Sequence, residues 1–331
     1  MQLFSIDDSS AVAPARRGVN ALAVRLGFDA EDTGRVALVA TEMSTNLVKH
    51  GEGGVLIAQT LSSATSRGIE LLALDKGPGI EDLAKSLRDG YSTGGSPGNG
   101  LGAIERLSQH FEIYTRPGQG TAVLAQLWPQ SRQPAPEPLE IGALVVPKPG
   151  ETECGDSWCY HEHSGGVLVL GIDGLGHGLA AAQASAEACR VFETVKTQPL
   201  TVAMQALHEA LRPTRGAAVT LVDMDWDQGR ATSIAVGNVI AALVTPEGAK
   251  RIASDNGIVG HVISRPRELE HSCPPGALLV MHSDGLTANW QPERYPGLMQ
   301  HHAALIAGVL YRDCTRRRDD SMIIVVRRVL S

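Results

Sequence analysis

Residues 129–138, PQSRQPAPEP, separate two segments of different chemical character. Four of these ten residues are proline, and none carries a large apolar side chain. Because proline fixes φ and lacks a backbone N–H, we expect a stiff, extended spacer that joins neither a sheet nor a core. The sequence therefore predicts a domain at 1–128, a proline-rich linker at 129–139 and a second domain at 140–331.

The composition of the chain is sufficient for two domains of ordinary size. With 331 residues, of which 43% are hydrophobic, each domain can bury a core of its own. The net charge of −7 argues against nucleic-acid binding, which usually requires a basic surface. Apolar runs such as 167–172 are only strand-length, and the N-terminus MQLFSIDDSS lacks the pattern of a signal peptide. We therefore expect a cytoplasmic protein that binds neither nucleic acid nor a membrane.

The cysteines are expected to be free. Their number is odd, and no pair of them has the spacing of a metal-binding motif. Thiols stay reduced in the cytoplasm, so packed thiols are favoured over disulfides or a zinc site. The cysteines are Cys154, Cys159, Cys189, Cys273 and Cys314.

Two helices are predicted near the N-terminus, at 11–26 and 31–50. On the second, Glu42, Asn46 and the pair Lys49 and His50 fall about one and two turns apart on a face adjacent to a stripe of apolar residues. Such a row could place a carboxylate, an amide and a cation along a bound phosphate chain. Asn46 would then be an oxygen ligand of Mg²⁺, and Glu42 a base or a water-orienting group. The alternative is a solvated helix face without a ligand.

Two glycine-rich segments follow this helix. A strand predicted at 69–74 runs directly into Asp75, Gly77 and Gly79 of the sequence DKGPGI. The carboxylate could accept a hydrogen bond from an adenine amino group, while the glycines let the backbone approach the base. The segment 90–102, GYSTGGSPGNGLG, then precedes a predicted helix, whose N-terminus could face phosphate oxygens. Taken singly, the first segment is a good turn and the second a flexible loop.

The order of these motifs resembles the Bergerat-fold ATPases of the GHKL superfamily. Within that superfamily, TEMSTNLVKHGEGG, DKGPGI and DGYSTGGSPGNGLG are most similar to the RsbT-type serine/threonine kinases of bacterial stress signalling. The resemblance implies an α/β sandwich that binds ATP and Mg²⁺, with Glu42 as general base and 90–102 as a lid over the phosphates. The cofactor-binding residues that it implies are Asn46, Lys49, Asp75, Gly77, Gly79, Gly98, Gly100, Leu101, Gly102 and Thr121.

Aspartates adjoin the predicted strands of the second half. Asp173 ends an apolar run, Asp284 follows another, and Asp319 and Asp320 precede a third. Asp156 lies in a segment expected to continue, through a turn, the strand predicted before it. Any one of them is more often a cap or a turn former. So much negative charge in one place requires compensation, which two divalent cations can supply. Ligation by oxygen alone favours Mg²⁺ or Mn²⁺, and two such ions can activate water for phosphate hydrolysis.

The order GD, GIDGLGHG, SDGL and DDSMIIVV resembles the PPM superfamily of metal-dependent serine/threonine phosphatases, in particular its SpoIIE and RsbX branch. This resemblance covers about 140–329 and implies an αββα sandwich. The metal ligands that it implies are Asp156, Asp173, the carbonyl of Gly174, Asp284 and Asp319, with Asp320 as a further candidate.

The two resemblances together imply a bifunctional regulator of bacterial stress signalling. It would phosphorylate Ser or Thr with ATP and Mg²⁺, and remove phosphate with two Mn²⁺ or Mg²⁺ ions. The expected partners are STAS-domain proteins, either anti-anti-sigma factors or components of a stressosome-like complex. One alternative is a phosphatase whose first domain only senses ATP or ADP, and another is a partner-switching binding module without catalysis. The presence of both Glu42 and Asn46 favours catalysis, because a docking surface needs no base.

Overall fold

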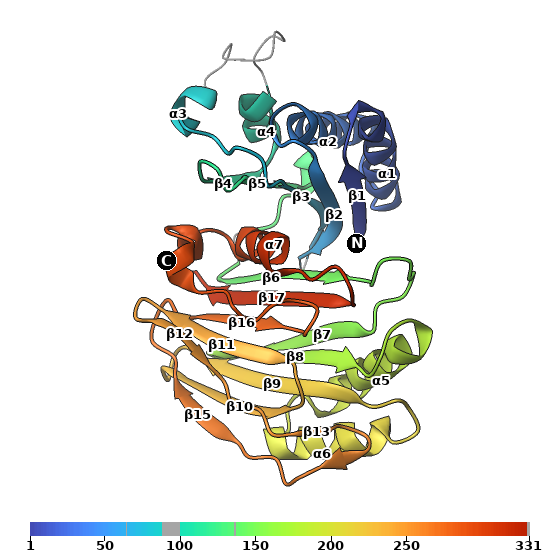
Figure 1. The fold of residues 1–331 in the computed structure, drawn as a ribbon, viewed down its shortest axis with the longest axis vertical. Coiled ribbons are helices and arrows are strands. Elements are labelled where there is room, and N and C mark those ends of the chain that lie inside the picture. The colour runs from blue at the N-terminus through green and yellow to red at the C-terminus, as the bar shows by residue number, and fades with distance from the viewer. Residues whose placement is uncertain (64, 88–99, 136, 330–331) are drawn as a thin grey trace. The chain divides into compact units, whose positions relative to one another are not determined.

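The computed structural model describes residues 1–63, 65–87, 100–135 and 137–329 (Figure 1). The chain divides into two compact units, Met1–Glu137 and Pro138–Ser331. Both units mix helices and strands, as the sequence predicts. No helix within the described ranges is long and apolar enough to cross a membrane.

The first unit is a two-layer α/β sandwich. Its antiparallel sheet has the order β1-β2-β3-β5-β4, and helices cover one face (Figure 1). Apolar side chains from that face of the sheet share one core with the helices. The strands are β1 Gln2–Ile6, β2 Gly54–Ser62, β3 Arg67–Leu74, β4 His110–Thr115 and β5 Thr121–Leu127, and the helices are η1 Ser9–Ala11, α1 Val12–Arg25, α2 Ala30–His50, α3 Leu83–Ser86 and α4 Gly100–Leu107.

Helix α2 begins after a capping residue and packs on the core through a stripe of apolar residues. Asp29 is the N-cap, and its Oδ1 accepts a hydrogen bond from the backbone N–H of Asp32 at 2.8 Å. Met43 and Leu47 are buried in the core of the unit, which contributes roughly 1.5–3 kcal/mol for each side chain. The helix ends at His50, and Gly51 is its C-cap. The face beside this apolar stripe carries the row of polar residues that the sequence singled out.

The second unit is an αββα sandwich, as expected. Two five-stranded sheets, β15-β10-β9-β8-β7 and β12-β11-β16-β17-β6, enclose one apolar core, and a second core lies between the first sheet and its helices. The helices are α5 Leu179–Val195 and α6 Leu200–Leu211 on the first sheet and α7 Ala303–Cys314 on the second (Figure 1). The strands are β6 Leu139–Val146, β7 Asp156–His163, β8 Gly166–Gly174, β9 Ala217–Asp225, β10 Arg230–Val236, β11 Ile240–Thr245, β12 Gly248–Arg251, β13 Gly257–Ile258, β14 Val262–Ile263, β15 Leu269–Ser272, β16 Leu278–His282 and β17 Ser321–Arg328, with short 3-10 helices η3 Pro292–Arg294 and η4 Leu298–Gln300.

Strand β7 corrects one expectation about this unit. The segment containing Asp156 was expected to continue the strand before it through a turn, but β7 pairs with β8 in one sheet while β6 pairs with β17 in the other. The chain changes sheets between β6 and β7, where Asp320 accepts hydrogen bonds from the backbone N–H groups of Lys148 and Gly155 at 2.8 Å each. A contact between residues this distant in sequence has no local signal.

The proline-rich spacer is not extended throughout. Gln130–Arg132 form a 3-10 turn, η2, and the N–H of Gln130 donates to Oδ2 of Asp32 at 3.1 Å. Asp32 also accepts from the guanidinium of Arg35, which in turn donates to the carbonyl of Trp128. The start of the spacer is therefore bound to α2. The prediction of a wholly extended segment was wrong because a carboxylate in α2 captures its first free N–H.

Candidate functional sites

A cavity of 810 Å³ lies in the first unit beside α2, the end of β3 and the start of α4. Its wall combines apolar side chains with the polar row of α2. The predicted site residues that line it are Glu42, Asn46, Lys49, Asp75, Gly79, Gly100, Leu101 and Thr121. The structure thus brings residues from four separate segments of the chain to one cavity.

Asp75 is fixed at one side of this cavity. It follows β3 directly and is 8% exposed. Its Oδ1 accepts backbone N–H groups from Gly77 and from Thr121, both at 3.0 Å. A Cβ at Gly77 would lie 2.8 Å from the backbone of Gly51, so this glycine lets the end of α2 approach the strand end. Gly77 therefore shapes the site without lining the cavity.

The polar row of α2 faces the N-terminus of α4. A Cβ built on Gly100 would lie 3.2 Å from Oδ1 of Asn46 and 3.7 Å from Oε2 of Glu42. The Nδ2 atom of Asn46 is buried and has no hydrogen-bond partner among the described residues. An orphaned buried amide is costly unless a ligand satisfies it. The amide of Asn46 and the carboxylate of Glu42 together fit a nucleotide that is bound with Mg²⁺.

Among the predicted glycines that the structure describes, Gly77 and Gly102 do not line the cavity. Gly98 and the larger part of the predicted lid, 90–102, lie outside the described residues. Gly102 is buried within α4. His50, which belongs to the polar row predicted on α2, also lines the cavity. Lys85 lines it as well, although it was not predicted to bind a cofactor and has no motif around it.

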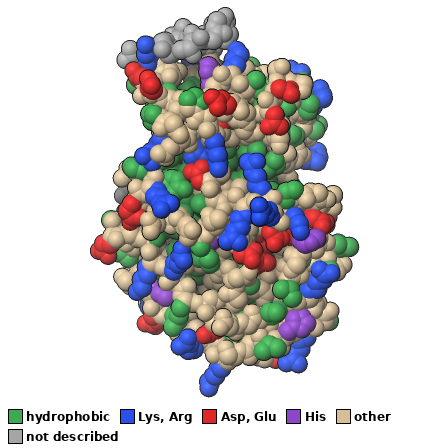
Figure 2. Space-filling view, in the orientation of Figure 1, with side chains coloured by type: hydrophobic (Ala, Val, Ile, Leu, Met, Phe, Trp, Pro, Cys, Tyr) green, Lys and Arg blue, Asp and Glu red, His purple; other side chains and the backbone are tan. Residues whose placement is uncertain are grey.

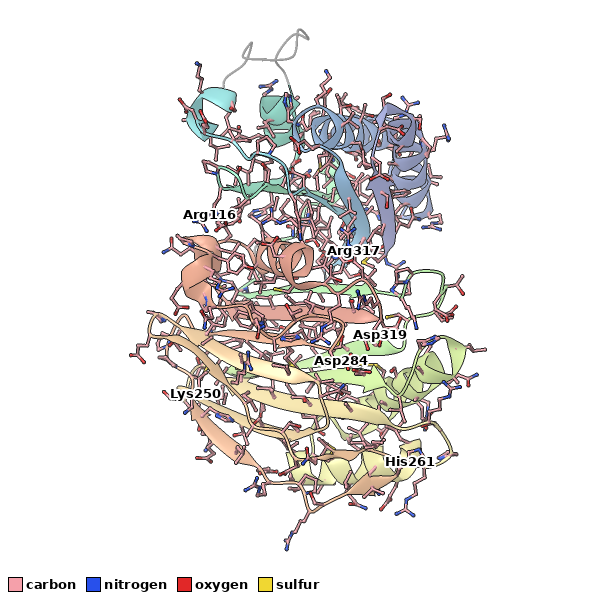
Figure 3. All side chains as sticks on the ribbon, viewed as in Figure 1. Arg116, Lys250, His261, Asp284, Arg317 and Asp319 are labelled. Atoms are coloured by element: carbon pink, nitrogen blue, oxygen red, sulfur yellow. A yellow bond between two sulfur atoms is a disulfide. The ribbon has the colours of Figure 1, made fainter. Side chains whose placement is uncertain are left out.

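A second cavity, of 140 Å³, lies in the second unit where β7, β8, β16 and β17 bring their aspartates together. Asp156 and Asp173 lie directly opposite each other in the β7–β8 ladder. Asp284 and Asp319 come from the second sheet and are labelled in Figure 3. The cavity is lined by Asp156, Asp173, Asp284, Asp319 and Asp320, together with Leu175, Gly176, Ala218, Asn238, Gly257 and Ile258. Gly174 ends β8 beside Asp173 but does not line the cavity.

The aspartates of this cavity repel one another. Burial, followed by the nearby charges of Asp284, Asp319 and Asp320, raises the pKa of Asp173 to about 7. Burial and the charge of Asp173 also raise the pKa of Asp156. No three of the His, Cys, Asp and Glu side chains in the described ranges are already arranged to hold a metal ion. The oxygen-only donor set and its uncompensated charge nevertheless fit hard divalent cations such as Mg²⁺ or Mn²⁺.

Neutral hydrogen-bond donors hold the carboxylates in place. The buried Oγ of Ser283 donates to Oδ2 of Asp156 at 2.6 Å and accepts the N–H of Met322 at 3.0 Å. Nδ2 of Asn238 donates to Oδ2 of Asp284 at 2.8 Å. Sequence reasoning missed Asn238, because an asparagine after a glycine reads only as a turn. Both oxygens of Asp320 accept backbone N–H groups, so this aspartate also fastens the segment before β7.

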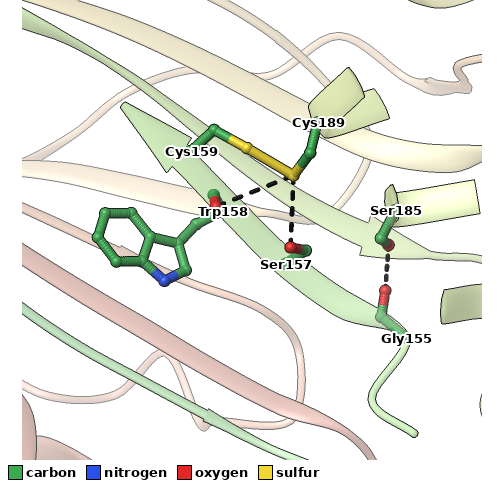
Figure 4. The surroundings of a disulfide bond; sticks show 6 residues. All are labelled: Gly155, Ser157, Trp158, Cys159, Ser185 and Cys189. Carbon is green, nitrogen blue, oxygen red and sulfur yellow. Dashed lines mark hydrogen bonds between the residues drawn. A yellow bond between two sulfur atoms is a disulfide. The ribbon is translucent and has the colours of Figure 1, made fainter. Parts of the chain in front are cut away.

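A disulfide joins β7 to α5 in the second unit (Figure 4). Cys159 of β7 is bonded to Cys189 of α5, so the prediction of free thiols was wrong for these two residues. The hydroxyl of Ser185, one turn earlier in α5, donates to the carbonyl of Gly155. Strand and helix bring together cysteines that are 30 residues apart, which no spacing rule indicates. Cys154, Cys273 and Cys314 form no disulfide with any other described residue.

Basic side chains adjoin the acidic group. Figure 2 shows Lys and Arg side chains beside clustered Asp and Glu side chains on this face of the second unit. The run 316–318, three arginines, is exposed and directly precedes Asp319. Arg317 is labelled near Asp319 in Figure 3 and has a positive φ of 52°. These guanidinium groups are available to an anion that approaches the carboxylates.

The folds and sites define a chain that joins a kinase-like ATPase domain to a PP2C-type phosphatase domain. Residues 6–127 match the histidine kinase-like ATPase domain, and residues 163–329 match stage II sporulation protein E (SpoIIE). The chain belongs to the SpoIIE family through its second unit, and its first unit is a histidine kinase-like ATPase domain. Both resemblances inferred from the motifs are confirmed.

Two relatives from Bacillus subtilis (strain 168) match different parts of the chain. The serine/threonine-protein kinase RsbT is 32% identical over 117 residues, which are 35% of this chain and 87% of RsbT. The phosphoserine phosphatase RsbX is 26% identical over 153 residues, which are 45% of this chain and 76% of RsbX. The two matches support the fusion of a kinase-like part with a phosphatase-like part.

Two solved structures are similar to the chain. A structure from "The bacterial stressosome: a modular system that has been adapted to control secondary messenger signaling" is 29% identical with a TM-score of 0.54, covering 58% of this chain and all (100%) of that chain. RsbX in complex with magnesium is 22% identical with a TM-score of 0.50, covering 59% of this chain and 98% of that chain. The likeness to RsbX shows the fold alone.

Proposed function

We propose that this protein is a bifunctional regulator of bacterial stress signalling. Its first unit would be an ATP-dependent Ser/Thr kinase and its second a metal-dependent Ser/Thr phosphatase, both acting on STAS-domain proteins. The observation that carries the proposal is the convergence of Asp156, Asp173, Asp284 and Asp319 on one cavity, in a chain whose other cavity presents Glu42 and Asn46. The printed names of RsbT, a kinase, and RsbX, a phosphoserine phosphatase, support the pairing.

In the phosphatase site, Asp156, Asp173, Asp284, Asp319 and the carbonyl of Gly174 would hold two Mg²⁺ or Mn²⁺ ions, with Asp320 as a further candidate. Such ions supply Lewis acidity and an activated water for phosphate hydrolysis when bound. The exposed arginines at 316–318 would orient the phosphate through charge-assisted hydrogen bonds.

The cavity wall of the phosphatase site also has an apolar part. Leu175 and Ile258 line the same cavity as the carboxylates. They would pack against the chain of the phosphorylated protein and exclude water from the contact. The substrate would therefore be a phosphorylated side chain on a folded or extended segment rather than a free phosphate ester.

In the kinase site, each polar residue would have a separate task. Asp75 would accept a hydrogen bond from the adenine amino group, and Lys49 would lie along the phosphates. Asn46 would contribute its amide oxygen to Mg²⁺ binding. Glu42 would remove the proton from the Ser or Thr hydroxyl of the partner, acting as general base.

The experiment that tests the proposal follows phosphate on a STAS-domain protein from the same genome. The full chain is incubated with radiolabelled ATP and Mg²⁺, and the labelled protein is then exposed to Mn²⁺. We expect transfer of label in the first step and its release in the second. Binding of ATP without transfer, followed by normal release, would establish an ATP-sensing phosphatase instead. Binding to the STAS-domain protein without either reaction would establish a partner-switching module.

The setting of the reaction is part of the proposal. The partner would be an anti-anti-sigma factor or a component of a stressosome-like complex, and the similarity to the stressosome structure supports the second of these settings. We place the reaction in the cytoplasm. Copurification of the full chain with its STAS-domain partner from a cytoplasmic extract tests this placement.

A further inference from the structure

Asn238 lies at the turn between β10 and β11 and lines the cavity of the aspartates. Its Nδ2 donates a hydrogen bond to Oδ2 of Asp284 at 2.8 Å. The Asn238 side chain makes no other hydrogen bond with the described residues. Asn238 thus connects the turn that joins the two sheets to a carboxylate just beyond the end of β16.

The turn that carries Asn238 is held in one conformation. Gly237 has a φ of +97°, which favours glycine, and a Cβ at this position would lie 2.5 Å from Cβ of Ala218. The N–H of Gly237 donates to the carbonyl of Asp255 at 2.9 Å, and its carbonyl accepts from Oγ of Ser254 at 2.8 Å. The position of Asn238 is therefore fixed by backbone contacts rather than by its own exposed side chain.

Asp284 needs such a support more than the buried carboxylates do. It lies two residues beyond the end of β16 and is exposed, whereas Asp156 is buried and already accepts a hydrogen bond from Ser283. An exposed side chain loses rotamer freedom when it binds a ligand, which costs binding free energy. A donor that holds the carboxylate in advance removes part of this cost.

The chemical type of the donor matters as well. A lysine or arginine at position 238 could also hold the carboxylate, but its positive charge would offset the negative charge that attracts a cation. An amide N–H fixes the carboxylate and leaves its charge intact. Asp156 likewise accepts a hydrogen bond from a neutral donor, the hydroxyl of Ser283. Side chains behind metal ligands commonly act in this way.

We infer that Asn238 is a positioning residue of the metal site, which orients the carboxylate of Asp284 for a divalent cation. This inference rests on the proposed phosphatase function. Loss of such a supporting hydrogen bond weakens metal binding roughly 10- to 100-fold in other proteins. Because Asn238 acts through Asp284, its loss raises the Mn²⁺ concentration needed for half-maximal activity, while kcat at saturating Mn²⁺ changes much less.

The test measures Mn²⁺ binding to the full chain by isothermal titration calorimetry without nucleotide. Asn238→Ala removes the donor, and Asn238→Gln keeps an amide on a longer side chain. Asn289→Ala, at an exposed asparagine outside both cavities, is the matched control. Thermal unfolding of each metal-free variant establishes that it is folded.

We expect Asn238→Ala to bind Mn²⁺ about tenfold more weakly than the unaltered chain, with Asn238→Gln between the two and Asn289→Ala unchanged. If the Mn²⁺ affinity of Asn238→Ala is within about threefold of that of the unaltered chain, the inference is overturned and the proposed function stands. A change this small is below the loss of affinity known for residues that support metal ligands. If the unaltered chain binds no Mn²⁺ at millimolar concentrations, the proposed function fails and the inference fails with it.

Discussion

Replacing Ser283 by alanine tests the contact that joins the two sheets at the second cavity. The side chain is buried, and its Oγ makes two hydrogen bonds, to Oδ2 of Asp156 at 2.6 Å and from the N–H of Met322 at 3.0 Å. Ser283→Ala removes both without creating a large cavity. It leaves the buried carboxyl of Asp156 short of one donor and a buried backbone N–H without an acceptor.

The size of the effect follows from these two losses. A hydrogen bond to a charged group contributes about 1.5–3 kcal/mol, and a buried N–H without a partner costs about 1–3 kcal/mol. Because the two bonds share one hydroxyl and relax together, we expect a total near the lower end, about 3 kcal/mol. For a domain of this size, that lowers the unfolding midpoint by roughly 6–12 °C.

Thermal unfolding of the metal-free full chain provides the measurement. Tryptophan fluorescence reports mainly on the second unit, which contains Trp158, Trp226 and Trp290. Ser272→Ala, at an exposed serine of β15, is the control for the loss of a hydroxyl. A midpoint for Ser283→Ala within about 2 °C of the control would show that neither hydrogen bond stabilises the fold as argued.

Three further predictions concern the proposed chemistry. Asp173→Asn should abolish hydrolysis of a phosphorylated STAS-domain protein and leave ATP binding intact, because the two cavities lie in different units; hydrolysis that continues in a chelator would contradict this. Asn46→Ala should lose Mg²⁺-dependent ATP binding, whereas Glu42→Gln should bind ATP without transferring phosphate, and calorimetry beside a transfer assay separates the two. The pKa of Asp173 is raised from 3.8 to about 7, so the folded state binds more protons than the unfolded state between these values. The free energy of unfolding of the metal-free chain should therefore fall as pH rises from about 4 to 7. Urea titrations measure this dependence on pH. A free energy of unfolding that does not fall over this range, or a fall that Mn²⁺ does not reduce, would refute the prediction.

Local sequence determined the elements that carry most of the chemistry. Glu42 and Asn46 share a face of α2 because residues four apart on a helix are neighbours, and the structure places both on one cavity. Asp173 could be located at a strand end because an apolar run stops there, and β8 ends at the following residue. Periodicity and strand ends are properties of a few consecutive residues, so they can be read without a fold.

Local sequence also contained signals that went unused. The strands β1 and β4 and the helices α6 and α7 were not predicted, although α6 carries apolar residues at helical spacing. Strand β1 has alternating burial and is followed directly by Asp7, Asp8, Ser9 and Ser10, which are residue types that bound strands. These omissions did not affect the motifs, because the motif residues lie on other elements.

Only the tertiary structure decided which distant residues meet. Asn238 reaches Asp284 across 46 residues, Asp320 binds the N–H of Gly155 across 165, and Cys159 meets Cys189 across 30. Such pairs form because strand pairing and helix packing fix the backbone first and then bring side chains within bonding distance. The free energy of each contact depends on burial and on the other partners at that point, neither of which is a property of the local sequence.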